Sequence, residues 1–177
     1  MSWTIARPVL DDLDEMGRVH VRVWQEAYAG LLPAEYLAAL DPASGPRRWR
    51  ERLGSSPAVS WWLARDEAGI VGLATSGPGR DDDAPVPLEL YAINVLARAH
   101  GTGLAADLVG HAIGDRPAYL WVLDGNARAI AFYAKLGFTD EGGRKPEPET
   151  GVTEIRMARG HLAPWSPSHI SPVSPIS

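Results

Sequence analysis

The chain has 177 residues, of which 45% are hydrophobic and seven are tryptophans, so it is long and apolar enough to bury the core of one ordinary domain. It contains no cysteine, which excludes a disulfide framework, a thiolate metal site and a cysteine nucleophile. The formal net charge of −5 argues against a general nucleic-acid binder, because such proteins are usually basic.

The first half of the chain reads as a strand, a group of helices and a strand hairpin. In chain order we expect a strand at 3–7, helices at 13–28, 34–40 and 46–53, and paired strands at 59–65 and 70–76. Asp11 and Asp12 are suited to cap the first helix. A loop of Gly, Asp and Pro residues follows at 77–87.

The second half alternates strands and helices. We expect a strand at 88–95, a helix that opens at 102 or 103, a strand at 118–123, a helix at 127–136 and a closing strand pair at 138–141 and 152–158. The strand at 88–95 is nearly all apolar, which suits burial on both faces. The alternation predicts an α/β fold with a mixed sheet in one domain, 1–160. The Pro/Ser-rich segment 161–177 is expected to form a tail without a fold of its own.

A glycine-rich turn follows the strand at 88–95. Gly101 and Gly103 let the backbone approach a ligand closely, and a helix that opens there points unpaired N–H groups at the turn. A diphosphate is the natural occupant, and Arg98 and His100 could add charge or a donor. A plain strand-to-helix turn fits the same pattern. A Rossmann-type dinucleotide site is a further alternative, although it lacks its third glycine here.

A second block follows about 30 residues downstream. It consists of Asn126, a helix that carries Tyr133, and Gly137 in the place where a left-handed helix end is wanted. With both blocks in this order, the chain resembles the GNAT superfamily of N-acetyltransferases, most clearly over 88–138. The resemblance implies a single-domain fold with a splayed central sheet flanked by helices, and acetyl-CoA as the acyl donor.

The resemblance also implies how acetyl-CoA is held. The strands at 88–95 and 118–123 would splay, and the pantetheine arm would pair with backbone groups in the wedge like an added strand. Backbone amides of the glycine turn would hold the diphosphate. The implied cofactor-binding residues are Ile93, Asn94, Val95, Arg98, Ala99, His100, Gly101, Thr102, Gly103, Leu104, Asn126 and Tyr133.

Amine acylation needs a base for the attacking amine and an acid for the leaving thiolate. Tyr133 matches the family's acid, although an aromatic residue on a packed helix is often only part of the core. Glu89 is the candidate base. On a regular strand it shares a face with Tyr91, Ile93 and Val95. Burial of a carboxylate costs free energy unless the group is paired or has a catalytic role. A salt bridge at the strand end is the equal alternative.

Four aromatic residues are expected to shape an acceptor pocket, although each alone is more often a core residue: Trp24, Tyr28, Tyr91 and Trp121. His20 and His111 lie on helix stripes and are expected to be packing or surface residues. The run Asp81-Asp82-Asp83 could attract a cationic acceptor, but a solvated loop is the simpler interpretation.

We therefore expect a metal-independent N-acetyltransferase that moves the acetyl group directly to a primary amine, on a small molecule or a protein amino terminus. A non-catalytic acyl-CoA-binding module on the same fold is the alternative. No signal peptide or membrane span is recognisable, so we expect a soluble cytoplasmic monomer or homodimer without nucleic-acid or membrane partners. The tail could lie along a partner subunit or be a loose end.

Overall fold

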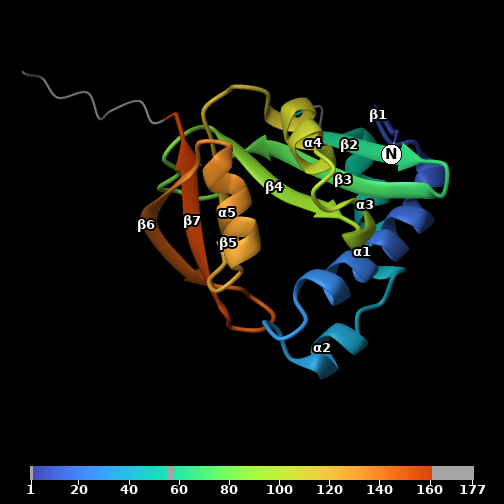
Figure 1. Cartoon of the computed structure of the whole chain (residues 1–177), viewed down its shortest axis with the longest axis horizontal. Helices are drawn as coiled ribbons and strands as arrows, with labels where there is room; N and C mark the ends of the chain where they lie inside the picture. Colours follow the sequence, from blue (N-terminus) through green and yellow to red (C-terminus); the bar gives the residue numbers. More distant parts are fainter. Residues whose placement is uncertain (1, 56–57, 161–177) are drawn as a thin grey trace, which may run out of the picture.

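The computed structural model describes residues 2–55 and 58–160, and this part of the chain forms a mixed sheet with helices packed against it (Figure 1). The strands are β1 (Thr4–Ala6), β2 (Ser60–Asp66), β3 (Gly69–Pro78), β4 (Leu88–Val95), β5 (Ala118–Leu123), β6 (Thr139–Pro146) and β7 (Thr153–Arg159). Their order is β1-β2-β3-β4-β5-β7-β6. The predicted α/β fold with a mixed sheet is confirmed.

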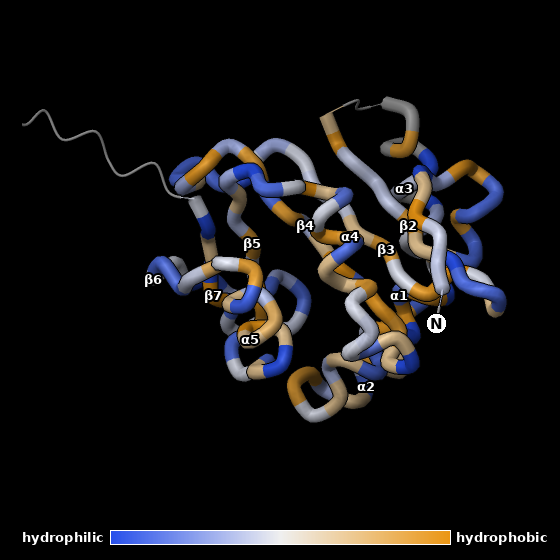
Figure 2. The backbone as a smooth tube through the Cα atoms, turned by 45° about the horizontal axis from the view of Figure 1, so that its top comes forward, coloured by the Kyte–Doolittle hydropathy of each residue, from blue (hydrophilic) through white to orange (hydrophobic). Residues whose placement is uncertain are grey.

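The helices are α1 (Leu13–Ala27), α2 (Ala34–Ala38), α3 (Ser44–Ser55), α4 (Leu104–Ile113) and α5 (Ala127–Lys135), with 3-10 turns η1 (Leu10–Asp12) and η2 (Ala97–Ala99). The apolar stripes of α1 and α4 pack against β3 and β4 and bury the main core there. Figure 2 shows apolar segments gathered along these strands, with polar residues at the periphery.

Most predicted elements agree with the structure, but the cap of α1 and the extent of β6 differ. Asp12 stands at the start of α1 without capping it: its carboxylate accepts the N–H of Val9 at 2.9 Å and pairs with Arg65. β6 runs on to Pro146, well past the predicted end at 141, because its second half also pairs with β7. Within the described ranges, no helix is long and apolar enough to cross a bilayer. The predicted tail, 161–177, lies outside the described residues.

The central strands part from each other. β4 and β5 run parallel and pair at one register position, Glu89 with Tyr119. Beyond it, β4 remains paired with β3 and β5 with β7, so the sheet divides into two halves (Figure 1). The splayed sheet is confirmed, and the Rossmann-type alternative is wrong, because every other strand pair in the described sheet is antiparallel.

A bulge in β4 changes which residues share a face. Thr75 pairs with Ala92 and Ser76 with Leu90, so Tyr91 is an extra residue with no partner in β3. The prediction that Glu89 shares a face with Ile93 and Val95 is therefore wrong, because the bulge shifts the alternation by one residue. The middle of β4 is also only half-buried, whereas the apolar sequence predicted burial on both faces.

Glu89 lies at the strand junction, the position where β4 and β5 still pair. Its side chain is 1% exposed. Its carboxylate accepts the Tyr119 hydroxyl at 2.9 Å and both the backbone N–H and the Nε of Arg80 at 3.0 Å. The Arg80 guanidinium also lies 4.3 Å from the centre of the Tyr91 ring. Glu89 thus ties the loop after β3 to both β4 and β5.

Glu89→Gln is expected to lower the free energy of unfolding by about 3 kcal/mol, because it removes the charge that pairs with Arg80 and leaves amide hydrogens facing donors. Urea denaturation measures the change. Glu67→Gln is the control, because Glu67 is an exposed carboxylate in the β2–β3 turn, and we expect an effect within about 0.5 kcal/mol. Equal stability of the two variants would show that the Glu89 ion pair does not hold the junction together.

Candidate functional site

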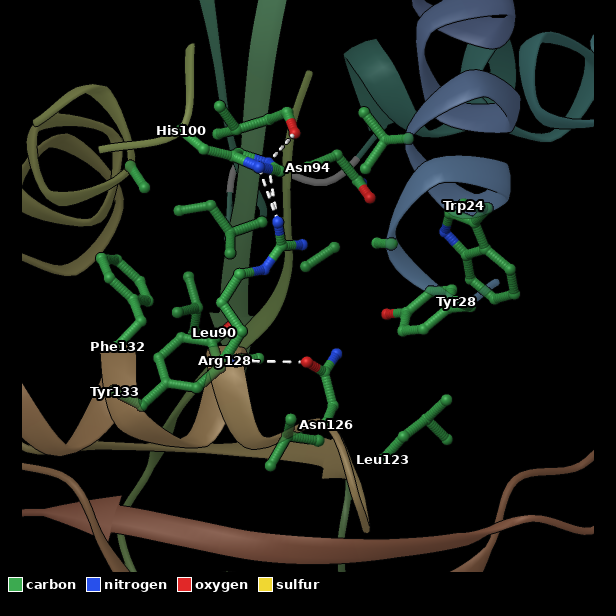
Figure 3. Close-up of a pocket in the computed structure, with 18 of the residues that line it drawn as sticks. Trp24, Tyr28, Leu90, Asn94, His100, Leu123, Asn126, Arg128, Phe132 and Tyr133 are labelled. Atoms are coloured by element: carbon green, nitrogen blue, oxygen red, sulfur yellow. Dashed lines mark hydrogen bonds between the residues drawn. The ribbon is translucent and has the colours of Figure 1, made fainter. Parts of the chain in front are cut away.

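A cavity of about 720 Å³ lies where β4 and β5 part. Its walls come from β4 on one side and from β5 and α5 on the other, and it is closed by α1, by the glycine turn before α4 and by the start of β7 (Figure 3). This volume is typical of small-molecule sites.

The structure brings most of the predicted site residues to this cavity. Those that line it are Trp24, Tyr28, Tyr91, Ile93, Asn94, Val95, Ala99, His100, Gly101, Gly103, Trp121, Asn126 and Tyr133. Four predicted residues lie outside the lining. Glu89 is bound at the strand junction, Arg98 pairs with Asp66 in the β2–β3 hairpin, the Thr102 hydroxyl donates to a carbonyl of its own turn, and Leu104 is fully buried in the core.

The glycine turn forms a cradle of backbone donors. Gly101 and Gly103 have φ values of +76° and +98°, a backbone conformation that residues other than glycine rarely adopt. A Cβ at either position would meet no atom within 4 Å. In the described part of the chain, the N–H groups of Gly101, Gly103 and Ala105 have no hydrogen-bond acceptor. Gly103 also caps α4, whose dipole adds a partial positive charge. An anion such as a diphosphate fits this cradle.

Two cationic side chains of α5 line the cavity and were not predicted. Arg128 lies in the first turn of α5 and donates to Nδ1 of His100 at 2.6 Å (Figure 3). The His100 Nε2 lies 3.0 Å from the carbonyl oxygen of Val95, so the ring connects α5 to the end of β4. Lys135 lines the cavity from the last turn of α5. The sequence could have indicated both residues, because they lie on the predicted helix that follows Asn126.

Asn126 and Tyr133 belong to the same helix. The Asn126 side chain caps α5 by accepting the N–H of Ala129 at 3.2 Å, so it fixes where the helix begins. The Tyr133 ring packs against Phe132 and Phe138. Figure 3 shows this ring extending from α5 towards β4.

The Tyr133 side chain is 8% exposed, and burial raises the pKa of its hydroxyl. No hydrogen bond to this hydroxyl is formed within residues 2–55 and 58–160. The sequence left open whether Tyr133 is a core residue or a site residue. The two roles are compatible, because the ring packs in the core and still lines the cavity.

Aromatic and acidic residues gather on the side of the cavity next to β7. Trp24 of α1 and Tyr28, which caps the end of α1, are in edge contact at 5.1 Å between ring centres, and burial raises the pKa of Tyr28. Glu154 of β7 and Glu147 of the β6–β7 connection also line the cavity. The sequence analysis missed both carboxylates, because the only signals were a single acidic residue at the start of β7 and an acidic residue in the loop before it. The Trp121 indole donates to Asp81 at 2.8 Å while its ring lines the cavity.

The remaining polar residues of the sequence analysis fall into two groups. His20 lines the cavity and lies between Trp24 and Trp49, whereas His111 lies outside the cavity against Trp62. The run at 81–83 does not line the cavity. Its first and last carboxylates pair with Arg156, so the run connects its loop to β7, while Asp82 and Asp83 are exposed to solvent.

Comparison with known proteins identifies the family of this fold and site. A family model described as Acetyltransferase (GNAT) family matches residues 23–138. An uncharacterized N-acetyltransferase of Mycobacterium tuberculosis is 32% identical over 142 residues, 76% of this chain and 88% of that protein. The uncharacterized N-acetyltransferase YuaI of Bacillus subtilis is 29% identical over 138 residues, 74% of this chain and 78% of that protein.

Solved structures share the whole fold. The PaiA N-acetyltransferase of Thermoplasma acidophilum, in complex with coenzyme A, superposes with a TM-score of 0.70 over 91% of this chain and 100% of that chain, at 16% identity. A protein of Corynebacterium glutamicum described as histone acetyltransferase HPA2 and related acetyltransferase superposes with a TM-score of 0.65 at 24% identity, over 94% of this chain and 100% of that one. At these identities the likeness shows the fold.

Proposed function

The chain belongs to the acetyltransferase (GNAT) family, and we propose that it transfers an acetyl group from acetyl-CoA directly to a primary amine. The observation that carries this proposal is the cavity between the parted strands, which combines a backbone anion cradle with the Tyr133 ring. The names of the curated relatives and the coenzyme A bound to the Thermoplasma protein support the same reaction class.

The residues present fit an acyl-CoA. The free N–H groups of Gly101, Gly103 and Ala105 would hold the diphosphate, and Arg128 supplies a cation next to them. The half of β4 that has no partner strand on the β5 side offers backbone groups to the amides of the pantetheine arm. When bound, acetyl-CoA supplies a thioester carbonyl as the electrophile.

Tyr133 is the proposed general acid. Its hydroxyl would give a proton to the departing thiolate, whose parent thiol has an ordinary pKa of about 8.5. Because burial raises the pKa of Tyr133, the hydroxyl stays protonated throughout the neutral range, so the donor is always present. A backbone N–H on the unpaired edge of β4 is the proposed donor to the negative charge that develops on the carbonyl oxygen.

The attacking amine must first lose a proton, since only about one amine in a thousand is neutral at pH 7. Glu89 is poorly placed to act as the base, because Arg80 and Tyr119 occupy its carboxylate and it lies outside the cavity lining. We assign Glu89 to the strand junction. With no cysteine in the chain, we propose that the amine attacks the thioester in a ternary complex.

Acetyl-CoA should bind in the micromolar range by calorimetry and raise the melting temperature. A ligand at 100 times its dissociation constant stabilises a protein by about 2.7 kcal/mol, which corresponds to a shift of roughly 5–10 °C for a chain of this size. NAD and ATP are the controls and should produce no comparable shift.

Absence of both heat and thermal shift with acetyl-CoA and CoA would contradict the proposal. Mass spectrometry of a panel of amines incubated with acetyl-CoA then tests transfer itself. Tight binding of acetyl-CoA without acetylation of any amine would instead favour the non-catalytic acyl-CoA-binding module.

A further inference from the structure

The cavity has an acidic side and a cationic side. Arg128 points from α5 towards His100 and the glycine cradle (Figure 3). Glu154 lies on β7, where its register partner in β5 is Leu123. Figure 3 places Leu123 across the cavity from His100. A ligand that spans the cavity therefore meets positive groups near the cradle and a carboxylate near β7.

Glu154 differs from the other carboxylates near the site because nothing binds it. Within residues 2–55 and 58–160 its carboxylate has no hydrogen bond and no ion pair, although the residue is half-buried and lines the cavity. Glu147 is different, since its carboxylate accepts the N–H groups of Glu149 and Thr150 and the Thr150 hydroxyl. A half-buried charge without a partner is costly, so a cationic ligand would relieve that cost.

The cation on the neighbouring strand, Lys145, is paired elsewhere. Lys145 pairs with Glu154 in the register of β6 and β7, but its ammonium lies 3.7 Å from Asp81 and 4.0 Å from the centre of the Trp121 ring. The aromatic rings of Trp24 and Tyr28 line the cavity in the same region and can contact an alkylammonium group.

Tyr28, Tyr133 and Glu154 all line the same cavity. Figure 3 shows Tyr28 across the cavity from Tyr133, on the same side as Leu123, which is the register partner of Glu154 in β5. An amine that reacts beside Tyr133 can place a second nitrogen, several bonds away, against Glu154.

We infer that the acceptor is an aliphatic amine with a second ammonium group, and that Glu154 selects it by binding the nitrogen that does not react. The inference rests on the proposed function and specifies its acceptor. Glu154 is thus a specificity residue: it forms the ion pair with the distal ammonium, while Trp24 and Tyr28 contact the alkyl chain and the cation.

Three acceptors with five carbon atoms each test the distal charge: diaminopentane, pentylamine and aminopentanoate, which end in an ammonium, a methyl and a carboxylate group. With the natural protein, kcat/KM should fall by about tenfold or more from the diamine to pentylamine and further to the amino acid, as expected for loss of one partly buried charge pair. Glu154→Gln should remove the advantage of the diamine over pentylamine. Glu67→Gln, an exposed carboxylate away from the cavity, should preserve the whole order.

The pH dependence adds a readout specific to Glu154. Burial and the charges of Glu147 and Glu89 raise the pKa of Glu154 above its ordinary 4.5, while Lys145 and Arg80 oppose the rise. The carboxylate is charged above that pKa, so the advantage of the diamine should be present above it and disappear as the pH falls through it. Glu154→Gln should show no such change in preference.

The outcomes separate this inference from the proposed function. If pentylamine and aminopentanoate are acetylated as well as the diamine, the inference is overturned and the acyltransferase stands. If no amine is acetylated, the proposed function fails, and diaminopentane is titrated calorimetrically into the CoA-saturated protein. Saturable heat that Glu154→Gln abolishes would still support the cation site, and absence of heat would overturn it.

Discussion

Tyr133→Phe should lower kcat by about 10²–10⁴ and leave the dissociation constant of acetyl-CoA unchanged within about twofold. The substitution removes only the hydroxyl, so the ring contacts with Phe132 and Phe138 remain. Within the described residues that hydroxyl has no hydrogen bond to lose, and we expect the free energy of unfolding to change by less than about 1 kcal/mol. Single-turnover kinetics, calorimetry and urea denaturation measure the three quantities.

The pH profile makes this prediction sharper. Because burial raises the pKa of Tyr133 above its ordinary value of about 10, the acid form persists at every pH below that value. Tyr133 should therefore contribute no fall in kcat on the alkaline side below about pH 10. Unchanged kcat in Tyr133→Phe across the acceptor panel would leave the residue as a core aromatic only.

Local features of the site were predictable from the sequence. Gly101 and Gly103 were recognised because positive φ angles and a helix start depend on neighbouring residues only. Gly137 was placed correctly at the end of α5 for the same reason, with φ +84°. The splay of β4 and β5 is a property of strand pairing, and the resemblance to a known family supplied it.

Features that depend on distant pairing could not be predicted. Glu154 reaches the cavity because β7 inserts between β5 and β6, and no local pattern gives that order. Glu89 was assigned to the wrong face of β4 because regular alternation was assumed, whereas the bulge at Tyr91 interrupts it. Its partner Arg80 comes from a loop whose course the sequence does not specify.

The second large effect is expected at Gly103. Gly103→Ala should weaken acetyl-CoA binding by about 100-fold, or close to 2.8 kcal/mol, because the new methyl group would project into the open space that the cradle reserves for the diphosphate. The same substitution also strains the backbone, since φ is +98° there, and should cost about 1–2 kcal/mol of folding free energy. Loss of binding alone therefore does not prove a steric effect in the cradle.

Gly142→Ala separates the two effects. Gly142 has φ +94°, and a Cβ there would also meet nothing within 4 Å, but it lies in β6 outside the cavity lining. Both variants should lose similar stability in urea, whereas only Gly103→Ala should lose affinity for acetyl-CoA in a calorimetric titration. Equal affinity of the two variants would mean that the glycine turn does not hold the diphosphate. The cofactor would then have to bind elsewhere. Among the described residues that line the cavity, only this turn has two glycines with open space around them and N–H groups without an acceptor.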